Sequence, residues 1–368
     1  MTQSEQATGF PIRLSPRRWC IALAMWLTAM WQSPYMGERW EDFTAADGYR
    51  VPYAMSEDYW HYERLTRLQS EAKKILLIGD SVVWGEYVKP EGSLSSCLNR
   101  QFNGKPRRAE RFANGGVNGL HPVALAGMVE HYTGGLRNQK VIVHCNLLWM
   151  SSPERDLQTD KELPFNHPRL APQFFGRPPC YRASVDERLS VVIRRASRFF
   201  SWVDHLRTVY YDGQDLHHWA VEHPYEHPSS QITGRLPAPE ERLRHLPIAW
   251  TARKLRPQDT PWVKLADSLQ WRAFQRAIES LRDRGNDVFV MVGPLNEWML
   301  TEQSLVRYQA LKSEAAQWLD SEGVPFLTMP VLASETYADA SHPLRIGYEF
   351  WADALLSDNA FAAWMSYR

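Results

Sequence analysis

The sequence lacks an excess of either charge. It has 368 residues, of which 42 are Lys or Arg and 42 are Asp or Glu, so the formal net charge is zero. A protein that binds nucleic acid through its phosphates needs a basic surplus to release counterions, and this chain has none. We therefore expect no nucleic-acid partner.

Cysteine is also scarce. Four cysteines occur, and no two of them form a Cys-x-x-Cys pair, which argues against a zinc knuckle or a redox motif. Their positions are Cys20, Cys97, Cys145 and Cys180. One disulfide, between Cys97 and Cys180, stays open because pairing cannot be read from spacing.

The sequence also lacks an apolar run long enough to span a bilayer as a straight helix, and its longest candidate lies near the N-terminus. Residues 19–31 (WCIALAMWLTAMW) carry no charge and follow Arg13, Arg17 and Arg18, which is the layout of a signal sequence. A helix of this length rises about 20 Å, whereas the hydrocarbon core of a bilayer is about 30 Å thick. No small-x-small cleavage site follows, so we predict an uncleaved signal anchor in residues 1–36 of an exported, membrane-anchored or periplasmic protein. A cleaved signal peptide and a buried helix of a cytosolic protein remain alternatives.

Hydrophobic residues are nevertheless abundant, at 44% of the chain, and 12% of the residues are aromatic. This composition excludes a disordered acidic protein and suffices for a large core. Aromatic side chains in this number also suit an apolar or sugar-stacking cleft. The length fits one large domain or a domain with a big insertion.

Short apolar runs alternate along the chain with segments of helical period. The run at residues 74–78 (KILLI) is typical of a fully buried strand in a parallel sheet. The strands we expect are residues 74–78, 108–112, 140–145, 288–292 and 325–329. The helices we expect are residues 59–71, 93–102, 122–132, 265–281, 305–319 and 344–356. This alternation predicts an α/β fold, with a parallel sheet and helices on both faces.

The alternation stops between residues 151 and 261. This segment is rich in Pro, His, Arg and aromatic residues and contains one expected amphipathic helix, at residues 185–210. A loop of this length inside a compact domain is usually functional or partly disordered. We interpret it as an insertion that forms a cap beside the sheet of a domain spanning residues 73–368. Residues 37–72 are then a linker and a first helix.

The insertion carries histidines and arginines that suggest two kinds of site. Its histidines lack the helical spacing of metal ligands, so we expect solvated or packed side chains and no metal. They are His217, His218, His223, His227 and His245. Its arginines suit the carboxylates of an acidic polysaccharide, but surface ion pairs with nearby glutamates are the interpretation we prefer. They are Arg194, Arg195, Arg198, Arg242 and Arg244.

Polar side chains follow several of the expected strands. Ser81 comes just after the first strand, in Gly79-Asp80-Ser81, where open α/β sheets bind ligands. A serine there suits a nucleophile, although an N-cap is the commoner role. Asp339 precedes His342 by three residues on a loop, so its carboxylate is within reach to align the imidazole. The alternative is that Asp339 is the N-cap of the last helix.

Two further positions suit donors of hydrogen bonds to an oxyanion. The turn at residues 114–119 (NGGVNG) contains Gly116, and glycines let the backbone approach a ligand closely. Asn146 ends the strand KVIVHC, where its amide could donate to the same oxyanion. Each has an ordinary structural alternative, a tight turn for the glycines and a cap for the asparagine.

Together these motifs resemble the SGNH (GDSL-type) hydrolase superfamily. The GDS of residues 79–81 is similar to its first block, and the Asn-x-Gly-x-x-Gly pattern of residues 114–119 is similar to its second. Asn146 matches the asparagine of its third block, and Asp339-x-x-His342 matches its fifth. All four appear in the order of the family and at the expected ends of strands.

The resemblance covers about residues 73–150 and 262–357, and neither the N-terminus nor the insertion. The third block departs from the usual Gly-x-Asn-Asp, since this chain reads His144-Cys145-Asn146 and then leucine. The change places an imidazole beside the site and removes a carboxylate that usually helps to hold the loop.

The resemblance implies a flavodoxin-like three-layer α/β/α fold and acyl chemistry without a cofactor. Ser81 is then the nucleophile, His342 the general base and Asp339 the group that orients His342. The N–H groups of Ser81 and Gly116 and the amide of Asn146 form the oxyanion hole in this interpretation.

The function that we expect is a serine-dependent esterase whose substrate is an ester, such as an O-acetyl group on a polysaccharide. A polysaccharide O-acetyltransferase is one alternative, because both reactions pass through the same acyl-enzyme. A non-catalytic envelope binding or assembly protein on the same scaffold is the other, and the altered third block is its motivation. The members closest in layout are exported and membrane-anchored.

Overall fold

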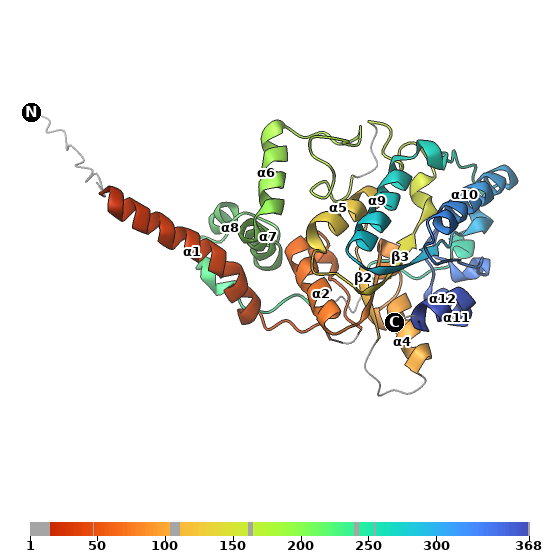
Figure 1. The fold of residues 1–368 in the computed structure, drawn as a ribbon, viewed down its shortest axis with the longest axis horizontal. Coiled ribbons are helices and arrows are strands. Elements are labelled where there is room, and N and C mark those ends of the chain that lie inside the picture. The colour runs from red at the N-terminus through yellow and green to blue at the C-terminus, as the bar shows by residue number, and fades with distance from the viewer. Residues whose placement is uncertain are drawn as a thin grey trace, which may run out of the picture.

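A computed structural model describes most of the chain (Figure 1). The described residues are 15–46, 48–103, 111–160, 165–238, 243–253 and 255–366. Arg13, Arg108 and Arg242, which entered the predictions above, lie outside them. The following paragraphs concern the described residues.

The described part of the chain contains one sheet of five parallel strands in the order β2-β1-β3-β4-β5. The strands are β1 (Ile75–Gly79), β2 (Phe112–Gly116), β3 (Lys140–Cys145), β4 (Asp287–Val292) and β5 (Phe326–Thr328). The chain reverses its direction of travel across the sheet between β1 and β3, which is where doubly wound sheets place their ligands. The α/β fold with a parallel sheet is therefore confirmed, as three layers α/β/α.

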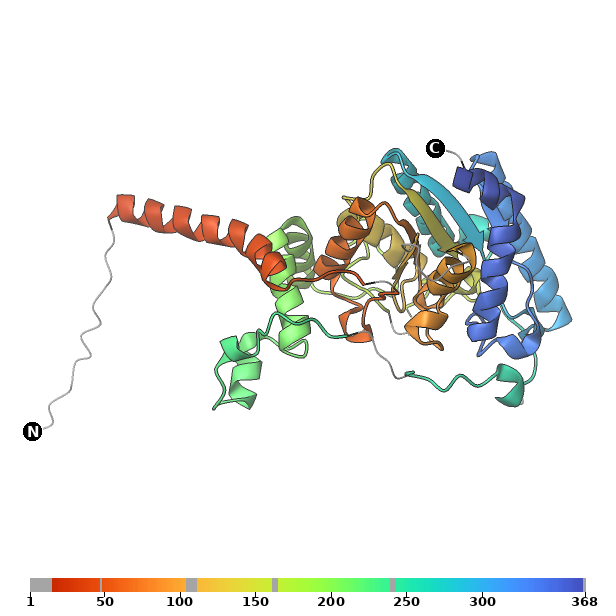
Figure 2. The same ribbon diagram turned by 90° about the horizontal axis from the view of Figure 1, so that it is seen from below.

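Helices cover both faces of this sheet (Figures 1 and 2). One face packs against α2 (Tyr59–Glu71), α5 (Pro122–Tyr132), α9 (Leu269–Asp283) and α10 (Glu302–Ser321). The other packs against α4 (Leu94–Asn103), α11 (Arg345–Ser357) and α12 (Asn359–Ser366). The helix α12 was not predicted. Because both faces are covered, the strands are apolar at nearly every position.

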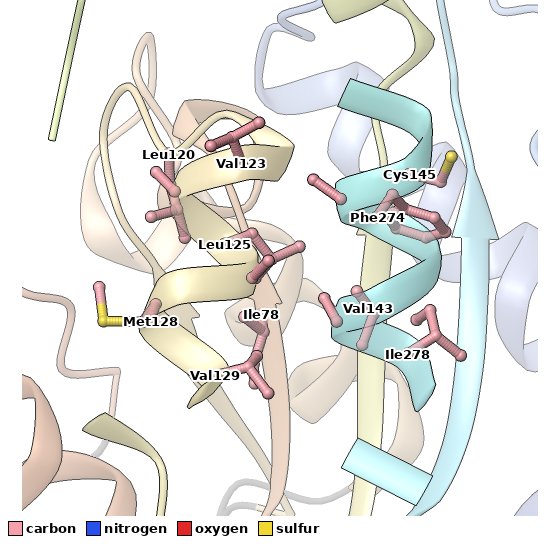
Figure 3. Packing of buried hydrophobic residues seen from close by; sticks show 14 of the residues in the cluster. Ile78, Leu120, Val123, Leu125, Met128, Val129, Val143, Cys145, Phe274 and Ile278 are labelled. Atoms are coloured by element: carbon pink, nitrogen blue, oxygen red, sulfur yellow. The ribbon is translucent and has the colours of Figure 1, made fainter. Parts of the chain in front are cut away.

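The side chains of β1 show how one strand serves both faces. Leu76 and Ile78 join the core under α5 and α9, whereas Ile75 and Leu77 join the core under α4 and α11. This is the two-residue period of a strand. Figure 3 shows Ile78 packed between α5 and α9 with apolar residues of β3.

The second strand is where the prediction was wrong. We expected residues 108–112, but β2 begins at Phe112 and runs through Asn114, Gly115 and Gly116. These residues pair with the whole length of β1. A Cβ on Gly115 would lie 2.9 Å from the carbonyl oxygen of Leu77, so glycine is needed for this close pairing. The signal that we interpreted as a turn is thus a strand with little room for side chains.

The insertion contains three helices, α6 (Val185–Ala196), α7 (Arg198–Tyr210) and α8 (Leu216–Glu222). The single helix predicted at residues 185–210 is wrong, because the backbone of Ser197 is extended at φ −120° and ψ 112°. The side chain of Ser201, in the first turn of α7, donates to the last-turn carbonyl of Arg194 in α6. In Figure 1, α7 lies beside α2, between the sheet and the N-terminal helix, and α6 packs against α7.

The N-terminal helix α1 (Pro16–Trp40) projects from the rest of the molecule (Figures 1 and 2). Residues 15–29 are all exposed, and only the C-terminal part packs, where Trp202 of α7 lies against Gly37. No helix among the described residues combines the length and the hydropathy needed to cross a bilayer. All four cysteines are free, so the disulfide between Cys97 and Cys180 is not formed.

Candidate active site

Ser81 is the first residue of a short helix, α3 (Ser81–Trp84), that follows β1. The N-cap of this helix is Asp80, whose Oδ1 accepts a hydrogen bond from the N–H of Val82 at 3.0 Å. The hydroxyl of Ser81 is therefore not used for capping. It lies 2.7 Å from Nε2 of His342.

The imidazole of His342 is held from its other side by Asp339. The Nδ1 of His342 lies 2.8 Å from Oδ1 and 2.9 Å from Oδ2 of this carboxylate. The Oδ1 also accepts from the backbone N–H groups of Ser341 and His342, each at 3.0 Å. Asp339 thus shapes its own loop, and it is not the N-cap of α11, which is Leu344.

This geometry indicates which ring nitrogen of His342 carries the proton. Nδ1–H of His342 donates to Asp339, so Nε2 is free to accept the hydroxyl proton of Ser81. Burial lowers the pKa of His342, but the charge and hydrogen bond of Asp339 outweigh it, and the pKa is raised. Burial raises the pKa of Asp339, but the interaction with His342 outweighs it and holds that carboxyl well below its usual range.

Side chains from three distant segments hold α3 in place by its carbonyl groups. Tyr348 of α11 donates to the carbonyl of Val82 at 2.6 Å, and the amide of Asn114 donates to that of Val83 at 3.0 Å. Arg50 donates to the carbonyl of Gly85 at 2.8 Å. Because these bonds satisfy the carbonyl groups at the end of α3, Ser81 stands on a fixed turn.

Gly116 supports the same turn by its lack of a side chain. A Cβ at this position would lie 2.2 Å from the backbone nitrogen of Trp84, so α3 could not pack on β2. The N–H of Gly116 donates to the side chain of Asn114 at 2.9 Å. Because this N–H is already bonded to Asn114, the structure gives no support to its predicted role in an oxyanion hole. The glycine is instead required so that α3 can pack closely on β2.

Asn146 lies at the end of β3 and faces Asp80. Its amide donates to Oδ2 of Asp80 at 2.7 Å, and the indole of Trp149 donates to the same oxygen at 2.9 Å. The Nδ1 of His144 lies 3.3 Å from Oδ1 of Asp80. Burial raises the pKa of Asp80, but His144 and Asn146 outweigh it and lower the pKa to about 2.

The departure in the third block thus has a structural counterpart. The imidazole of His144 lies beside the site, as expected, and its Nε2 donates to the carbonyl of Gly293 at 3.0 Å. The indole of Trp149 joins the loop after Asn146 to Asp80. The sequence motifs gave no signal for this role of Trp149.

Tyr87 is a second residue that the sequence analysis missed. Its hydroxyl donates to Oδ2 of Asp339 at 3.1 Å, and its ring centroid lies 5.6 Å from that of His342. Burial, together with the charge of Asp339, raises the pKa of Tyr87 to about 12, so this hydroxyl remains a donor. A lone tyrosine after the GDS motif carries no pattern that could have indicated this contact.

Two cavities adjoin the loops of the site. The first, of about 830 Å³, lies between the scaffold and the insertion, and its lining includes Tyr53, Asn118, Arg169 and Asp204. The second, of about 240 Å³, is lined in part by Ala340 of the loop between Asp339 and His342.

The first cavity is connected to the site through a chain of contacts. Asn118, in the turn after β2, donates to Glu86, and the charge of Glu86 acts on His342. His245 of the insertion lies 3.1 Å from the same carboxylate. Residues of the insertion therefore reach the neighbourhood of His342.

Within the described ranges, no three His, Cys, Asp or Glu side chains are placed to hold a metal ion. Of the five arginines singled out above in the insertion, the four that are described have protein partners. Arg194 pairs with Asp204, Arg198 with Glu38, and Arg195 donates to the carbonyl of Ala171. Arg244 lies 3.1 Å from the ring centroid of Tyr53 and 3.9 Å from Glu86.

No known protein-family model matches this chain, and no curated protein matches it significantly. The resemblance seen in the motifs therefore remains a prediction. The functional argument rests on the geometry of Ser81, His342 and Asp339.

Proposed function

We propose that this protein is a serine-dependent esterase of the SGNH type, which works through an acyl-enzyme. The observation that carries the proposal is the hydrogen-bonded series Ser81, His342 and Asp339, with contacts of 2.7 and 2.8 Å. The serine and the histidine are 261 residues apart in sequence, and they meet at the carboxyl edge of a parallel sheet. Nucleophilic acyl transfer by a serine requires a nucleophile, a base and an orienting carboxylate that are hydrogen-bonded in this order.

The first half of the reaction follows from these contacts. The Oγ of Ser81 attacks the carbonyl carbon of the ester while Nε2 of His342 takes the hydroxyl proton. Asp339 stabilises the imidazolium that forms. Collapse of the tetrahedral intermediate breaks the bond to the alcohol, which leaves with the proton of His342, and the acyl group stays on Ser81.

The oxyanion of the intermediate needs donors near Ser81. Among the described residues, the N–H of Ser81 has no acceptor, so this group is one donor in the proposal. Asn146 uses one amide hydrogen on Asp80, which fixes the amide and leaves its second hydrogen for the oxyanion. Gly116 takes part only if its N–H leaves Asn114.

The second half of the reaction decides between hydrolysis and transfer. In hydrolysis, His342 takes a proton from water, which attacks the acyl carbon and releases the acid. In transfer, a sugar hydroxyl takes the place of that water and a new ester forms. We propose hydrolysis as the main reaction and a carbohydrate as the alcohol part of the substrate, since the cavity beside the insertion is lined by charged and hydrogen-bonding side chains.

We also propose that the exposed half of α1 lies in the apolar part of a membrane. Consecutive apolar residues leave this segment without a polar face, and Trp19, Leu23 and Met25 are each more than half exposed. A helix that is apolar all round needs apolar surroundings. Arg17 and Arg18 at its end suit anionic lipid headgroups. Flotation of the full chain with anionic vesicles tests this, and equal flotation of the L23E variant would contradict it.

The test of the catalytic proposal is Ser81→Ala. We expect the full chain to hydrolyse p-nitrophenyl acetate, and the variant to lose at least about 10⁴-fold in kcat/KM because the nucleophile is gone. A fluorophosphonate probe should label the wild type and not the variant. The control is Ser321→Ala, at the exposed end of α10, which should keep both properties.

Two results would overturn the proposal. One is equal hydrolysis by the wild type and the Ser81→Ala variant. The other is a folded wild type that neither hydrolyses esters nor reacts with the probe, which would favour a binding protein on the same scaffold.

A further inference from the structure

Arg155 lies in the loop after β3, and its charge has no bonded partner among the described residues. Its side chain is partly buried, and within those ranges its guanidinium has neither a hydrogen bond nor an ion pair, while its backbone N–H donates to Ser152. The nearby carboxylate of Asp339 acts on its charge but is bonded to His342 and Tyr87. A guanidinium that is partly withdrawn from water without a counter-ion is costly unless a ligand supplies one.

Arg155 lines the smaller cavity, of about 240 Å³, which we name the Arg155 cavity. Its remaining wall includes Ser152, Trp262, Asn296, Met299 and Ala340. The volume is below the 300–1,000 Å³ typical of sites for drug-sized ligands. The cavity therefore suits one small group of a substrate and not a whole chain.

The walls of the Arg155 cavity are joined to the catalytic residues on two sides. Asn296 donates to the carbonyl of Ala340 through its backbone at 2.8 Å and to that of Asp339 through its amide at 3.2 Å. On the other side, the loop that leads to Arg155 is joined to Asp80 by Trp149. A group in the cavity is thus held beside the loop that carries the general base.

A second charge borders the cavity and has partners of its own. Asp259 is exposed, and its Oδ1 accepts hydrogen bonds from Ser304 at 2.6 Å and Thr301 at 3.3 Å. Oδ1 of Asp259 thus already has two hydroxyl donors, whereas no hydrogen bond of the Arg155 guanidinium is found among the described residues. The guanidinium of Arg155 can therefore donate hydrogen bonds to a ligand.

We propose that the Arg155 cavity binds a carboxylate on the alcohol part of the ester, so that the preferred substrate is an acylated sugar acid. The inference rests on the proposed esterase function. Arginine pairs with a carboxylate through two parallel N–H···O bonds, which fixes orientation as well as charge. Such a contact would place the ester of an acidic sugar at Ser81 and distinguish it from a neutral sugar.

The test compares two substrates that differ only in this group, an O-acetylated methyl glucuronoside and the matching O-acetylated methyl glucoside. We expect the full chain to prefer the acid by about 10- to 100-fold in kcat/KM, as for a hydrogen-bonded charge pair. In the Arg155→Gln variant the ratio should fall close to one, mainly through a higher KM for the acid. Arg155→Lys keeps the positive charge but cannot form two parallel N–H···O bonds, so it should retain part of the preference.

The matched control is Arg282→Gln, on an exposed position of α9, which should keep the full preference. An equal loss for both substrates in Arg155→Gln would overturn the proposal, because Arg155 would then act only through Asp339. No change in the ratio would overturn it as well.

Failure of the esterase proposal can be told apart by a binding measurement. Calorimetry of unacetylated methyl glucuronoside with the Ser81→Ala chain requires no turnover. Binding that is lost with a second substitution, Arg155→Gln, supports the cavity proposal whether or not esters are cleaved. Absence of binding in the Ser81→Ala chain, with hydrolysis intact in the wild type, overturns the cavity proposal alone.

Discussion

His342 and His205 are both held by carboxylates, and they differ in what faces the second ring nitrogen. His342 has Asp339 on one side and the hydroxyl of Ser81 on the other. His205, on α7, lies between two carboxylates, with Nδ1 2.6 Å from Asp58 and Nε2 2.7 Å from Glu41. The imidazole of His205 is fully buried and that of His342 is partly exposed, and only His342 has a hydroxyl on its second nitrogen from which it can take a proton.

The two environments give the imidazoles different protonation. Burial lowers the pKa of His205, but Asp58 and Glu41 outweigh it and raise the pKa to about 9, so this ring donates from both nitrogens. His342 has one carboxylate in direct contact, at Nδ1, so its Nε2 can accept a hydrogen bond from Ser81. The comparison indicates that a carboxylate beside a histidine does not by itself mark a catalytic base.

His205 instead joins three segments of the chain. Glu41 follows α1, Asp58 is the N-cap of α2, and His205 belongs to the insertion. Arg64 of α2 adds a bond to Glu41 at 2.7 Å. This buried group of charges fastens the base of α1 and the insertion to the scaffold.

Removing His342 should have the largest effect on activity. We expect His342→Ala to lower kcat/KM for p-nitrophenyl acetate by at least about 10⁴-fold, because no other group takes the proton of Ser81. The free energy of unfolding, measured in urea, should change little by comparison. Activity within tenfold of the wild type would contradict the assignment of the base.

Changing the orienting carboxylate should have the next largest effect. Asp339→Asn is expected to lower kcat/KM by about 10³- to 10⁴-fold and to shift its pH dependence. Catalysis needs neutral His342, so kcat/KM of the wild type should rise with pH through a midpoint above the ordinary histidine value of about 6.5. Without the charge of Asp339 that midpoint should move to lower pH. A midpoint that stays in place would contradict the pairing.

A substitution of His205 should lower stability and leave activity largely unchanged, the reverse of what we expect for His342. His205→Gln should cost about 3–5 kcal/mol of the free energy of unfolding, because buried Asp58 loses its counter-ion and buried Glu41 keeps only Arg64. Esterase activity of the folded protein should remain, since His205 has no contact with Ser81 or His342. A stable variant with lost activity would reverse the roles that we assign to the two histidines.

The stability should also depend on pH through His205. Its folded pKa of about 9 lies above the unfolded value of about 6.5, so its contribution is complete below the unfolded value. The contribution is lost as the pH rises through about 9. Urea unfolding of the wild type should therefore show a decline between these values that His205→Gln lacks, and equal declines would contradict the arrangement.

The smallest effect is expected at Tyr87. Its hydroxyl is one of several donors to Asp339, and its removal in Tyr87→Phe leaves the carboxylate bonded to His342. We expect kcat/KM to fall by about two- to tenfold, the effect of one neutral hydrogen bond. A loss as large as that of Asp339→Asn would show that Tyr87 does more than support the carboxylate.

Much of the fold could be predicted because local pattern and packing agree. The predicted bounds of α2, α5 and β3 are those of the structure. The prediction failed at β2, where the glycines have no periodic side chains to reveal a strand, and at Ser197, where one extended residue divides a continuous amphipathic pattern. In both places the backbone conformation depends on tertiary contacts, which the local sequence pattern does not show.

The sequence by itself determined the alternating fold and nominated Ser81, Asp339 and His342, because motifs in chain order imply which strand ends carry them. Only the tertiary structure decided that their atoms meet within 2.9 Å, that Asn146 is bonded to Asp80, and that the N–H of Gly116 faces Asn114. The reason is that a motif records residue type and spacing, whereas hydrogen bonds depend on the direction of each group. Arg155 is the same case, since only the placement of its described neighbours shows that none of them bonds its guanidinium.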